Sequence, residues 1–462
     1  MRKGTTRRDF LKQSAVLGVS VGFWVGTESD LLAQAKPRSA LDKLNFACIG
    51  VGGKGTSDTE QAARFGNIVA ICDIDDRPLE KMAAKFPGAK KYHDFRKMLE
   101  ELADKIDAVV ISTPDHTHAV AAVMAMRLGK HVYCQKPLTH NVYEARLLRE
   151  TARKNKVCTQ MGNQGTASAG LRRGVEVIRA GVIGPVREVH VWTNRPIWPQ
   201  APAVTSRPKP EPLPEYIKWD LFLGPAPERP YSSAYHPFKW RGWWDFGTGA
   251  LGDMGCHTAN LPYMALKLKY PISVEAQAGD VNPETYPSWA HVVWEFPARE
   301  GMPPVTFHWY EGRREGKLLR PPQELLERVL ASGVKGISSS GCIMVGDKGL
   351  LYSPSDYGGD WRLIPQELQA EASKVPQSLP RNQDGGDTGM KAELVMAIRE
   401  NKPEIAMSNF DYAGPLTEFI LLGNVAIKAG TKLQWDGENF KVTNHSEANK
   451  YLRREYRKGW EI

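Results

Sequence analysis

The chain has 462 residues, of which 42% are hydrophobic and 24% are charged, and its formal net charge at pH 7 is +9. This length is enough for two domains with real hydrophobic cores, and the basic and acidic residues are interspersed without a long basic block. The composition therefore indicates no nucleic-acid partner, and no stretch after the N-terminal region reads as a transmembrane helix.

The N-terminal region reads as an export signal. Its run Thr-Arg-Arg-Asp-Phe-Leu-Lys at 6–12 is a twin-arginine pattern, followed by a weakly apolar stretch at 14–26 and by Ala33-Gln34-Ala35, which has the form of a cleavage site. The apolar stretch is shorter than the roughly 20 residues that a bilayer requires. We therefore expect residues 1–35 to be a twin-arginine signal peptide whose removal leaves a periplasmic or otherwise exported protein without a stable membrane anchor, starting near Lys36.

A glycine-rich turn follows the first predicted strand, 44–49, and precedes a predicted helix, 56–65. Its spacing is G-x-G-x-x-G, in which the first glycine allows a tight turn, the second lets the backbone approach a pyrophosphate, and the third lets helix and strand pack closely. The amides at the start of the helix can hold the phosphates. We predict a dinucleotide site whose phosphate-binding residues are Gly50, Gly52, Gly53, Lys54 and Gly55.

A second apolar run, 68–72, ends in Asp73. The carboxylate lies close to the spacing of about 20 residues after the turn at which such sites bind the adenosine ribose hydroxyls. A negative charge there repels a 2′-phosphate, so NAD(H) is favoured over NADP(H), although Arg77, four residues further on, could soften this preference.

Strands and helices alternate as far as residue 161. We predict helices over 78–86, 93–102, 119–128 and 142–154, and strands over 108–112, 131–134 and 157–161. This alternation predicts an α/β Rossmann domain with a parallel sheet, which we assign to residues 36–162.

The alternation ends beyond Met161, where we predict a helix over 171–180 and a strand over 186–192. Residues 195–239 then form a long segment rich in proline and aromatic residues, and such loops are usually functional. The rings in the aromatic run 231–244 suit the apolar faces of sugars, and its polar groups could bind hydroxyls; core or interface packing is the alternative for at least half of them. The candidate substrate contacts are Asn163, Tyr235, His236, Trp240 and Arg241.

Asp253 and His257 lie four residues apart at the start of a predicted helix, so they share one helix face. Four glycines between 247 and 255 leave this backbone open to close approach. A histidine is a natural general base for an alcohol that loses a hydride, and a nearby carboxylate can orient it. A lone histidine is more often a structural residue, but this pairing favours a catalytic one.

The remainder of the chain reads as structural. We predict strands over 274–278, 290–296, 305–309 and 342–345, a hairpin turn at 346–349, and helices over 390–399 and 416–428. Residues 163–462 are therefore assigned to an α+β domain with a largely antiparallel open sheet, for substrate binding and oligomerisation. The six cysteines form no C-x-x-C pair and behave as core residues, so we predict neither a disulfide framework nor a metal site.

These motifs resemble the glucose–fructose oxidoreductase/inositol dehydrogenase/MocA (Gfo/Idh/MocA) family over essentially the whole chain after the signal. The resemblance rests on the glycine turn, the Thr113-Pro114…His118 loop, Gln135-Lys136-Pro137 and the glycine-rich run 247–257. It implies that Lys136, Asp253 and His257 are catalytic and that Thr113, Pro114, His118 and Lys136 contact the cofactor. The family usually has glutamate in place of Gln135 and often aspartate in place of Asn260, so neither residue is given a catalytic role.

The position of Lys136 supports a catalytic role independently of the resemblance. It follows a buried strand at the sheet edge where ligands of open α/β folds bind. An ammonium beside a hydride acceptor could hold a substrate hydroxyl and stabilise developing alkoxide charge. The alternative is an ordinary solvated lysine in a loop.

Three classes of function follow. The first is an exported NAD(H)-dependent oxidoreductase acting on a hydroxyl or keto carbon of a sugar, glycoside or cyclic polyol, with a tightly held cofactor because free NAD is scarce outside the cytoplasm. The second is an NAD-dependent glycoside hydrolase that works by oxidation, elimination and reduction without net redox change. The third is a non-catalytic glycan-binding protein. The expected partners are a small sugar or glycoside and further copies of the chain, joined through the C-terminal sheet.

Overall fold

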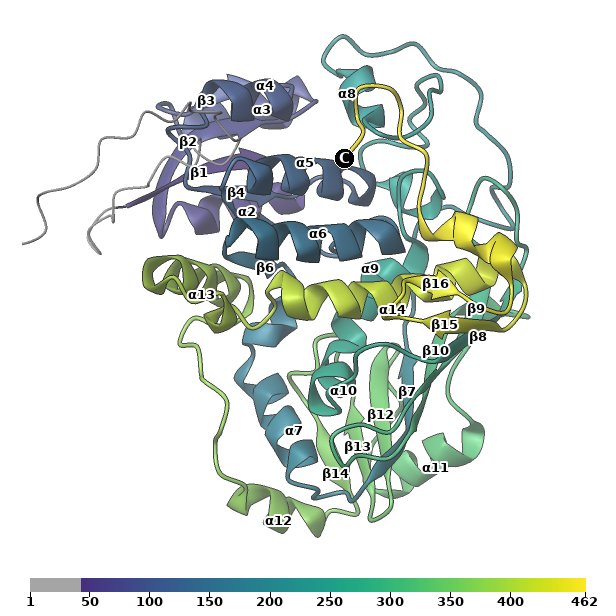
Figure 1. Cartoon of the computed structure of the whole chain (residues 1–462). Coiled ribbons are helices and arrows are strands. Elements are labelled where there is room, and N and C mark those ends of the chain that lie inside the picture. The colour runs from purple at the N-terminus through teal and green to yellow at the C-terminus, as the bar shows by residue number, and fades with distance from the viewer. Residues whose placement is uncertain (1–42) are drawn as a thin grey trace, which may run out of the picture. The chain divides into compact units, whose positions relative to one another are not determined.

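A parallel sheet of six strands begins the part of the chain that the computed structural model describes, residues 43–462 (Figure 1). Its strand order is β3-β2-β1-β4-β5-β6. The strands are β1 (Leu44–Ile49), β2 (Gly66–Cys72), β3 (Lys90–Tyr92), β4 (Ala108–Ile111), β5 (His131–Cys134) and β6 (Thr159–Met161). The order reverses between β1 and β4, and ligands of doubly wound sheets bind at such a point. The predicted export signal lies outside the described residues.

Helices connect these strands, as the alternating sequence predicts. They are α2 (Lys54–Ala62), α3 (Asp76–Lys85), α4 (Phe95–Glu101), α5 (Asp115–Arg127) and α6 (Val142–Asn155). Asp75, Asp94 and Asn141 cap α3, α4 and α6 by accepting a hydrogen bond from a backbone amide of the first turn. Helix α5 begins at Asp115, four residues before the predicted start.

The second sheet has ten strands in the order β14-β13-β12-β7-β10-β9-β8-β15-β16, with β11 paired to β10. The strands are β7 (Val186–Trp192), β8 (Ser273–Gly279), β9 (Trp289–Phe296), β10 (Val305–Arg314), β11 (Lys317–Leu318), β12 (Gly341–Gly346), β13 (Leu350–Ser353), β14 (Arg362–Ile364), β15 (Leu433–Asp436) and β16 (Lys441–Val442). Only β7 and β10 pair in parallel; the other pairs are antiparallel. This sheet confirms the predicted fold class.

Helix α14 (Phe410–Ala429) runs between α6 and the second sheet, as Figure 1 shows. Its Phe419 ring packs against Trp294, Phe296 and Phe307 on one face of the sheet. Helix α11 (Gln323–Ala331) covers part of the other face, where its leucines pack with Tyr310. The remaining helices are α7 (Ala169–Arg179), α8 (Trp219–Leu223), α9 (Gly249–Thr258), α10 (Asn260–Ala265), α12 (Leu368–Lys374) and α13 (Gly386–Glu400).

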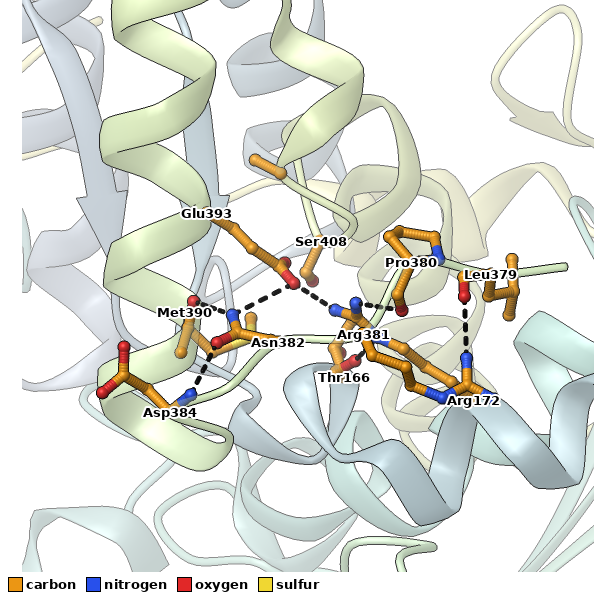
Figure 2. Close-up of polar contacts among 12 residues, drawn as sticks. Thr166, Arg172, Leu379, Pro380, Arg381, Asn382, Asp384, Met390, Glu393 and Ser408 are labelled. Atoms are coloured by element: carbon orange, nitrogen blue, oxygen red, sulfur yellow. Dashed lines mark hydrogen bonds and ion pairs between the residues drawn. The ribbon is translucent and has the colours of Figure 1, made fainter. Parts of the chain in front are cut away.

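A buried ion pair joins α7 to α13 (Figure 2). The guanidinium of Arg172 pairs with Glu393 and donates to the carbonyl oxygens of Thr166 and Pro380, each at 2.8 Å. Asn382 also donates to Glu393, at 3.3 Å. The segment that contains α13 therefore packs against α7, about 220 residues earlier in the chain. The domain boundary at residue 162 stays a prediction.

Two further findings concern the described residues. None of their helices is long and apolar enough to span a bilayer. All six cysteines are buried and unpaired, in agreement with the expected lack of a disulfide framework.

Candidate active site

The glycine turn between β1 and α2 has the predicted geometry. Gly50 has a φ of +76°, a conformation that glycine adopts without steric cost, and its amide donates to the carbonyl oxygen of Cys72 at 2.8 Å. A Cβ on Gly55 would lie 1.7 Å from the carbonyl oxygen of Gly50, so only glycine lets α2 approach the strand. Gly50, Gly52, Gly53 and Lys54 line a cavity of about 680 Å³, and Gly55 lies behind them.

Asp73 lies at the end of β2 and lines the same cavity. One carboxylate oxygen accepts hydrogen bonds from the amides of Val51 at 2.9 Å and Gly52 at 3.1 Å, and the other accepts from the amide of Asp75 at 3.0 Å. Burial raises the pKa of Asp73. Hydrogen bonds thus hold the carboxylate beside the glycine turn, where a ribose-binding group is expected.

Arg77 lines this end of the cavity, but its guanidinium is engaged. It donates to the two carboxylate oxygens of Asp75 at 3.0 and 2.6 Å, and it lies 4.0 Å over the ring of Tyr216. Asp75 is buried and also lines the cavity, so its charge offsets that of Arg77. This arrangement favours NAD(H) over NADP(H), because the carboxylate of Asp73 is left to repel a 2′-phosphate.

Lys136 lines the cavity at the end of β5. Its Nζ donates to the backbone oxygen of Asp253 at 3.0 Å and to its carboxylate at 3.1 Å, and Nε of Arg241 lies 3.5 Å from the same carboxylate oxygen. Burial disfavours the ammonium, but the charge of Asp253 offsets this effect and the pKa of Lys136 is raised. Lys136 and Arg241 lower the pKa of Asp253 against the effect of its burial. The pair is therefore ionised.

His257 lies in the last turn of α9, and it is not among the described residues that line the cavity. Its ring packs edge-on against Tyr357, with centroids 5.0 Å apart, and Nδ1 has no hydrogen-bond partner in the described part of the chain. Burial lowers the pKa of His257 well below its ordinary value, and the charges of Lys136 and Arg195 add to this. The imidazole is neutral at neutral pH.

The expected pairing of Asp253 with His257 is corrected by the structure. Helix α9 begins at Gly249, so Asp253 lies in its middle rather than at its start. The carboxylate binds Lys136 instead, and its influence on His257 is limited to its charge. Asp253 positions the lysine, which the sequence did not indicate.

Asp115 is a cavity residue to which the sequence argument gave no role. It is the first residue of α5, is 3% exposed, and accepts a hydrogen bond from Oγ1 of Thr248 at 2.7 Å. Burial raises the pKa of Asp115 to about 7. Its position directly after Thr113-Pro114, at the carboxyl end of β4, could have indicated that Asp115 belongs to the site. The helix was predicted to start at residue 119, so Asp115 was expected in a loop.

The two loops after β4 and β5 are joined by His118. Thr113 and Pro114 line the cavity as expected, whereas His118 is buried and does not. Its ring nitrogens each lie 2.8 Å from a backbone oxygen, one of Pro137 and one of Thr113. The structure therefore gives His118 a positioning contact rather than a contact with the cavity. The Lys136–Pro137 bond is cis.

A buried carboxylate beneath the glycine turn also escaped the sequence argument. Asp58 on α2 accepts hydrogen bonds from Gln135 at 2.8 Å and from Lys391 of α13 at 2.7 Å, and it lies 3.2 Å from Nζ of Lys54. Lys54 also pairs with Asp387 at 2.9 Å. Gln135 thus anchors the strand end to α2 through its amide, a contact that does not need the family's usual glutamate.

The candidate substrate contacts divide into two groups. His236, Trp240 and Arg241 line the cavity, and the guanidinium of Arg241 lies 4.2 Å over the ring of Trp240. His236 lies near the charges of Asp75 and Arg77, so it belongs to the Asp73 end of the cavity.

Tyr235 and Asn163 do not line the cavity. Tyr235 is buried among Trp243 and other rings, which is the packing alternative. Asn163 is fully buried, and its amide group accepts from Ser408 at 2.6 Å and donates to the carbonyl of Cys256 at 3.3 Å.

Two family models match the chain. Residues 44–163 match the model "Oxidoreductase family, NAD-binding Rossmann fold" (GFO_IDH_MocA), and residues 176–301 match its "C-terminal alpha/beta domain" (GFO_IDH_MocA_C2). Together the two models cover just over half of the chain.

Curated relatives match part of the chain. Myo-inositol 2-dehydrogenase of Thermotoga maritima is 26% identical over 34% of this chain and 47% of its own length. Glycosyl hydrolase family 109 proteins are 30% identical over 34% of this chain and 39% of the relative in Solibacter usitatus, and 34% identical over 32% and 34% in Shewanella sp. strain ANA-3. The chain thus spans between about a third and a half of the length of these relatives.

Solved structures match nearly the whole chain. WlbA dehydrogenase from Chromobacterium violaceum, in complex with NADH and UDP-GlcNAcA, has a TM-score of 0.60 at 16% identity and covers 88% of this chain and 99% of its own. An inositol dehydrogenase homolog from Azotobacter vinelandii, complexed with NADH and myo-inositol, has a TM-score of 0.57 at 16% identity, with 86% and 98% covered. At this identity the likeness establishes the fold.

Proposed function

The chain belongs to the Gfo/Idh/MocA family of oxidoreductases and carries its NAD-binding Rossmann domain, and we propose that it oxidises a hydroxyl carbon, or reduces the keto carbon, of a sugar, glycoside or cyclic polyol. The observation that carries this proposal is one continuous cavity that reaches from Asp73 and the glycine turn to the Lys136–Asp253 ion pair. Its volume, about 680 Å³, lies within the range of small-molecule and cofactor sites.

The residues present fit a dinucleotide. A Cβ on Gly52 would lie 3.1 Å from Cβ of Pro78 and 3.6 Å from the Asp73 carboxylate, so a side chain there would fill the space beside the ribose-binding group. The turn at Gly50–Gly53 would hold the pyrophosphate and Asp73 the adenosine ribose, while Thr113, Pro114 and Lys136 flank the nicotinamide end. The nicotinamide supplies the hydride acceptor or donor when bound.

Lys136 is the group that holds the reacting oxygen in this proposal. Its ammonium is kept charged by Asp253, and a charged donor stabilises the negative charge that develops on an alkoxide. Arg241 also contacts the Asp253 carboxylate and stacks on the ring of Trp240, so it connects the ion pair to this aromatic side chain.

Two groups can accept the proton of the hydroxyl. His257, the base that the family resemblance implies, is neutral and has an unpartnered Nδ1 within the described residues. Its environment includes Lys136, Arg195 and Tyr357, so we propose that the sugar binds at this end of the site, past the Lys136–Asp253 pair. Asp115 faces the cavity and changes charge near neutral pH, which makes it the second candidate.

We also propose that the enzyme works outside the cytoplasm, on the strength of the twin-arginine run at 6–12. Twin-arginine export carries folded proteins, so a bound cofactor can travel with the chain. Free NAD is scarce outside the cytoplasm, and the cofactor would then remain bound while it is reduced and reoxidised within the site.

A second candidate function is supported by the glycosyl hydrolase family 109 relatives. Oxidation of a ring carbon acidifies the neighbouring C–H bond, and a base then removes that proton while the aglycone is lost. Water next adds to the resulting double bond. Return of the hydride to the oxidised carbon then restores the alcohol. No net redox change results. Asp115 suits the additional proton transfer, because its pKa of about 7 lets it both accept and return a proton at neutral pH.

One experiment separates these functions. The purified protein is incubated with a panel of glycosides and polyols, and mass spectrometry reads both the bound cofactor and the products. We expect NAD(H) to co-purify and one class of substrate to yield a keto sugar. Free aglycone with unchanged cofactor would instead establish the hydrolase, and a glycan that stays bound and unchanged beside NAD would favour a glycan-binding protein.

A further inference from the structure

A cluster of histidines lies on the face of the second sheet that is turned away from α14. His190 on β7 and His308 on β10 are direct partners in the parallel strand pair. Glu188 precedes His190 by two residues and therefore faces the same side of the sheet. The alternate residues Val189 and Phe307 are buried in the core on the other face.

The three side chains converge on one point. Oε1 of Glu188 lies 2.9 Å from Nε2 of His190 and 3.4 Å from Nε2 of His308, and the three atoms lie within 4.8 Å of one another. Zinc ligands at about 2.0–2.1 Å from a tetrahedral ion are separated from each other by about 3.3 Å. Two imidazole nitrogens with one carboxylate oxygen form a ligand set that zinc uses when its fourth position is left to water.

The outer nitrogens of both histidines have partners of their own. Nδ1 of His190 lies 3.0 Å from the hydroxyl of Tyr310, and Nδ1 of His308 lies 3.2 Å from Nε2 of His291. Metal-binding histidines normally use their second ring nitrogen in this way, which sets the tautomer and directs the other nitrogen to the ion.

The charge and exposure of the cluster suit a cation. Glu188 brings a carboxylate to the two imidazole rings, and zinc accepts both kinds of ligand. His190 is 1% exposed and Glu188 is 45% exposed, so an ion can reach the buried nitrogen past the carboxylate.

We propose that Glu188, His190 and His308 bind one divalent transition-metal ion of the zinc type and that this ion clamps β7 to β10. The imidazole rings of His190 and His308 lie parallel, 4.7 Å apart, so each must tilt about its Cβ–Cγ bond for both lone pairs to meet the ion. The expectation of no metal site came from spacing along the chain, and these ligands come from two strands that are far apart in sequence. None of the three lines the proposed active-site cavity.

The test is Zn²⁺ binding by the full-length, untagged protein after treatment with EDTA and dialysis. Equilibrium dialysis with elemental analysis should give one Zn²⁺ per chain, with Mg²⁺ failing to compete, and thermal unfolding should move to higher temperature. Glu188→Gln and His308→Gln should each weaken Zn²⁺ binding at least about tenfold and abolish the thermal shift. His445→Gln, at an exposed histidine outside the cluster, should bind as wild type.

Co²⁺ bound in place of Zn²⁺ should show visible d–d absorption that disappears in Glu188→Gln, a change that keeps the size of the side chain. Circular dichroism and retained NAD report that each variant is folded. Wild-type protein that binds no Zn²⁺ would overturn the proposal, as would wild-type Zn²⁺ affinity in both Glu188→Gln and His308→Gln.

Discussion

Asp73 illustrates how one carboxylate can serve both the fold and the ligand. It accepts amide hydrogen bonds from the glycine turn and lines the cavity, while the neighbouring Arg77 is held by Asp75. Asp73→Ala should therefore weaken NAD binding by about 1–3 kcal/mol through lost hydrogen bonds. Isothermal titration measures this, with Asp360→Ala as an exposed control. Equal affinity of the wild type for NADP and NAD would contradict the assignment.

The Lys136–Asp253 ion pair makes a sharper prediction than either residue alone. Lys136→Ala should keep NAD but lose about 10²–10³-fold in turnover, because the donor to the developing alkoxide is gone. In Asp253→Asn the buried ammonium loses its counter-charge, so the pKa of Lys136 falls. As the pH is raised, the variant should therefore lose activity at a lower pH than the wild type does. Single-turnover rates against pH test both variants. An unchanged basic limb in Asp253→Asn would show that Lys136 does not depend on this carboxylate.

Asp115 should govern the acidic limb of the pH profile. Its pKa of about 7 means that the carboxyl becomes ionised as the pH rises through neutrality, so kcat/KM for oxidation should rise over that interval and Asp115→Asn should flatten the rise. His257→Ala should instead lower turnover by about 10²–10⁴-fold and leave the limb in place. Wild-type turnover in His257→Ala together with an inactive Asp115→Asn would assign the proton to Asp115.

The same carboxyl gives an effect on stability with a defined sign. Its folded-state pKa of about 7 lies above the ordinary 3.8, so the unfolded chain releases this proton more readily than the folded one. Its contribution to stability therefore falls as the pH rises between these two values. Asp115→Asn, which cannot ionise, should lose less stability than wild type over that interval.

Among the elements, the strands that were predicted lie close to their expected ranges, whereas β3, β11, β13, β14, β15 and β16 were not predicted. β1, β5 and β7 match the expected ranges residue for residue, because short apolar or alternating runs bounded by turn residues leave little choice. The start of α5 was placed four residues late, and Asp253, which was expected at a helix start, lies in the middle of α9. Helix α5 begins with polar residues and α9 begins with glycines. Neither set of residues has a high helix propensity, so tertiary contacts decide where these two helices begin.

The glycines of α9 and α14 have a packing reason. A Cβ on Gly255 would lie 3.2 Å from Ile420, and a Cβ on Gly423 would lie 2.5 Å from Leu251 and 2.8 Å from Trp294. Gly423→Ala should therefore destabilise the protein by about 1–3 kcal/mol through overpacking. Gly336→Ala, where nothing lies within 4 Å, is the matched control and should change stability by less than about 0.5 kcal/mol. Urea unfolding of both variants measures the difference, and equal midpoints would contradict the packing account.

At the scale of the molecule, the site is completed by residues from the far end of the chain. Lys391 of α13 binds Asp58 beneath the glycine turn, and Trp460 lines the cavity next to Phe95. These contacts could not be predicted from the sequence, since no local pattern links positions more than 300 residues apart. The glycine turn, Asp73, Lys136 and Asp253, in contrast, could be placed at the site from the sequence, and they line the cavity, because each lies at a strand end or in a glycine run.

Two predictions, export and assembly, concern the whole chain. Arg7→Lys with Arg8→Lys should leave the precursor folded and uncleaved in the cytoplasm, because the twin-arginine pair is the feature that the export machinery reads. Cell fractionation measures this, and normal periplasmic accumulation of the double variant would refute it. Association of copies through the C-terminal sheet stays a prediction for sedimentation.

In the proposed reaction, a sugar carbon gives its hydride to NAD held in the cavity beside Lys136. The direct test is a single turnover with an accepted glycoside that carries deuterium on its hydroxyl-bearing ring carbons, followed by mass spectrometry of the bound cofactor. We predict that deuterium appears on the nicotinamide in wild type, whether or not the reaction has a net redox change, and that Lys136→Ala slows this transfer while NAD occupancy is unchanged. Product formed with no deuterium ever reaching the cofactor would contradict the account.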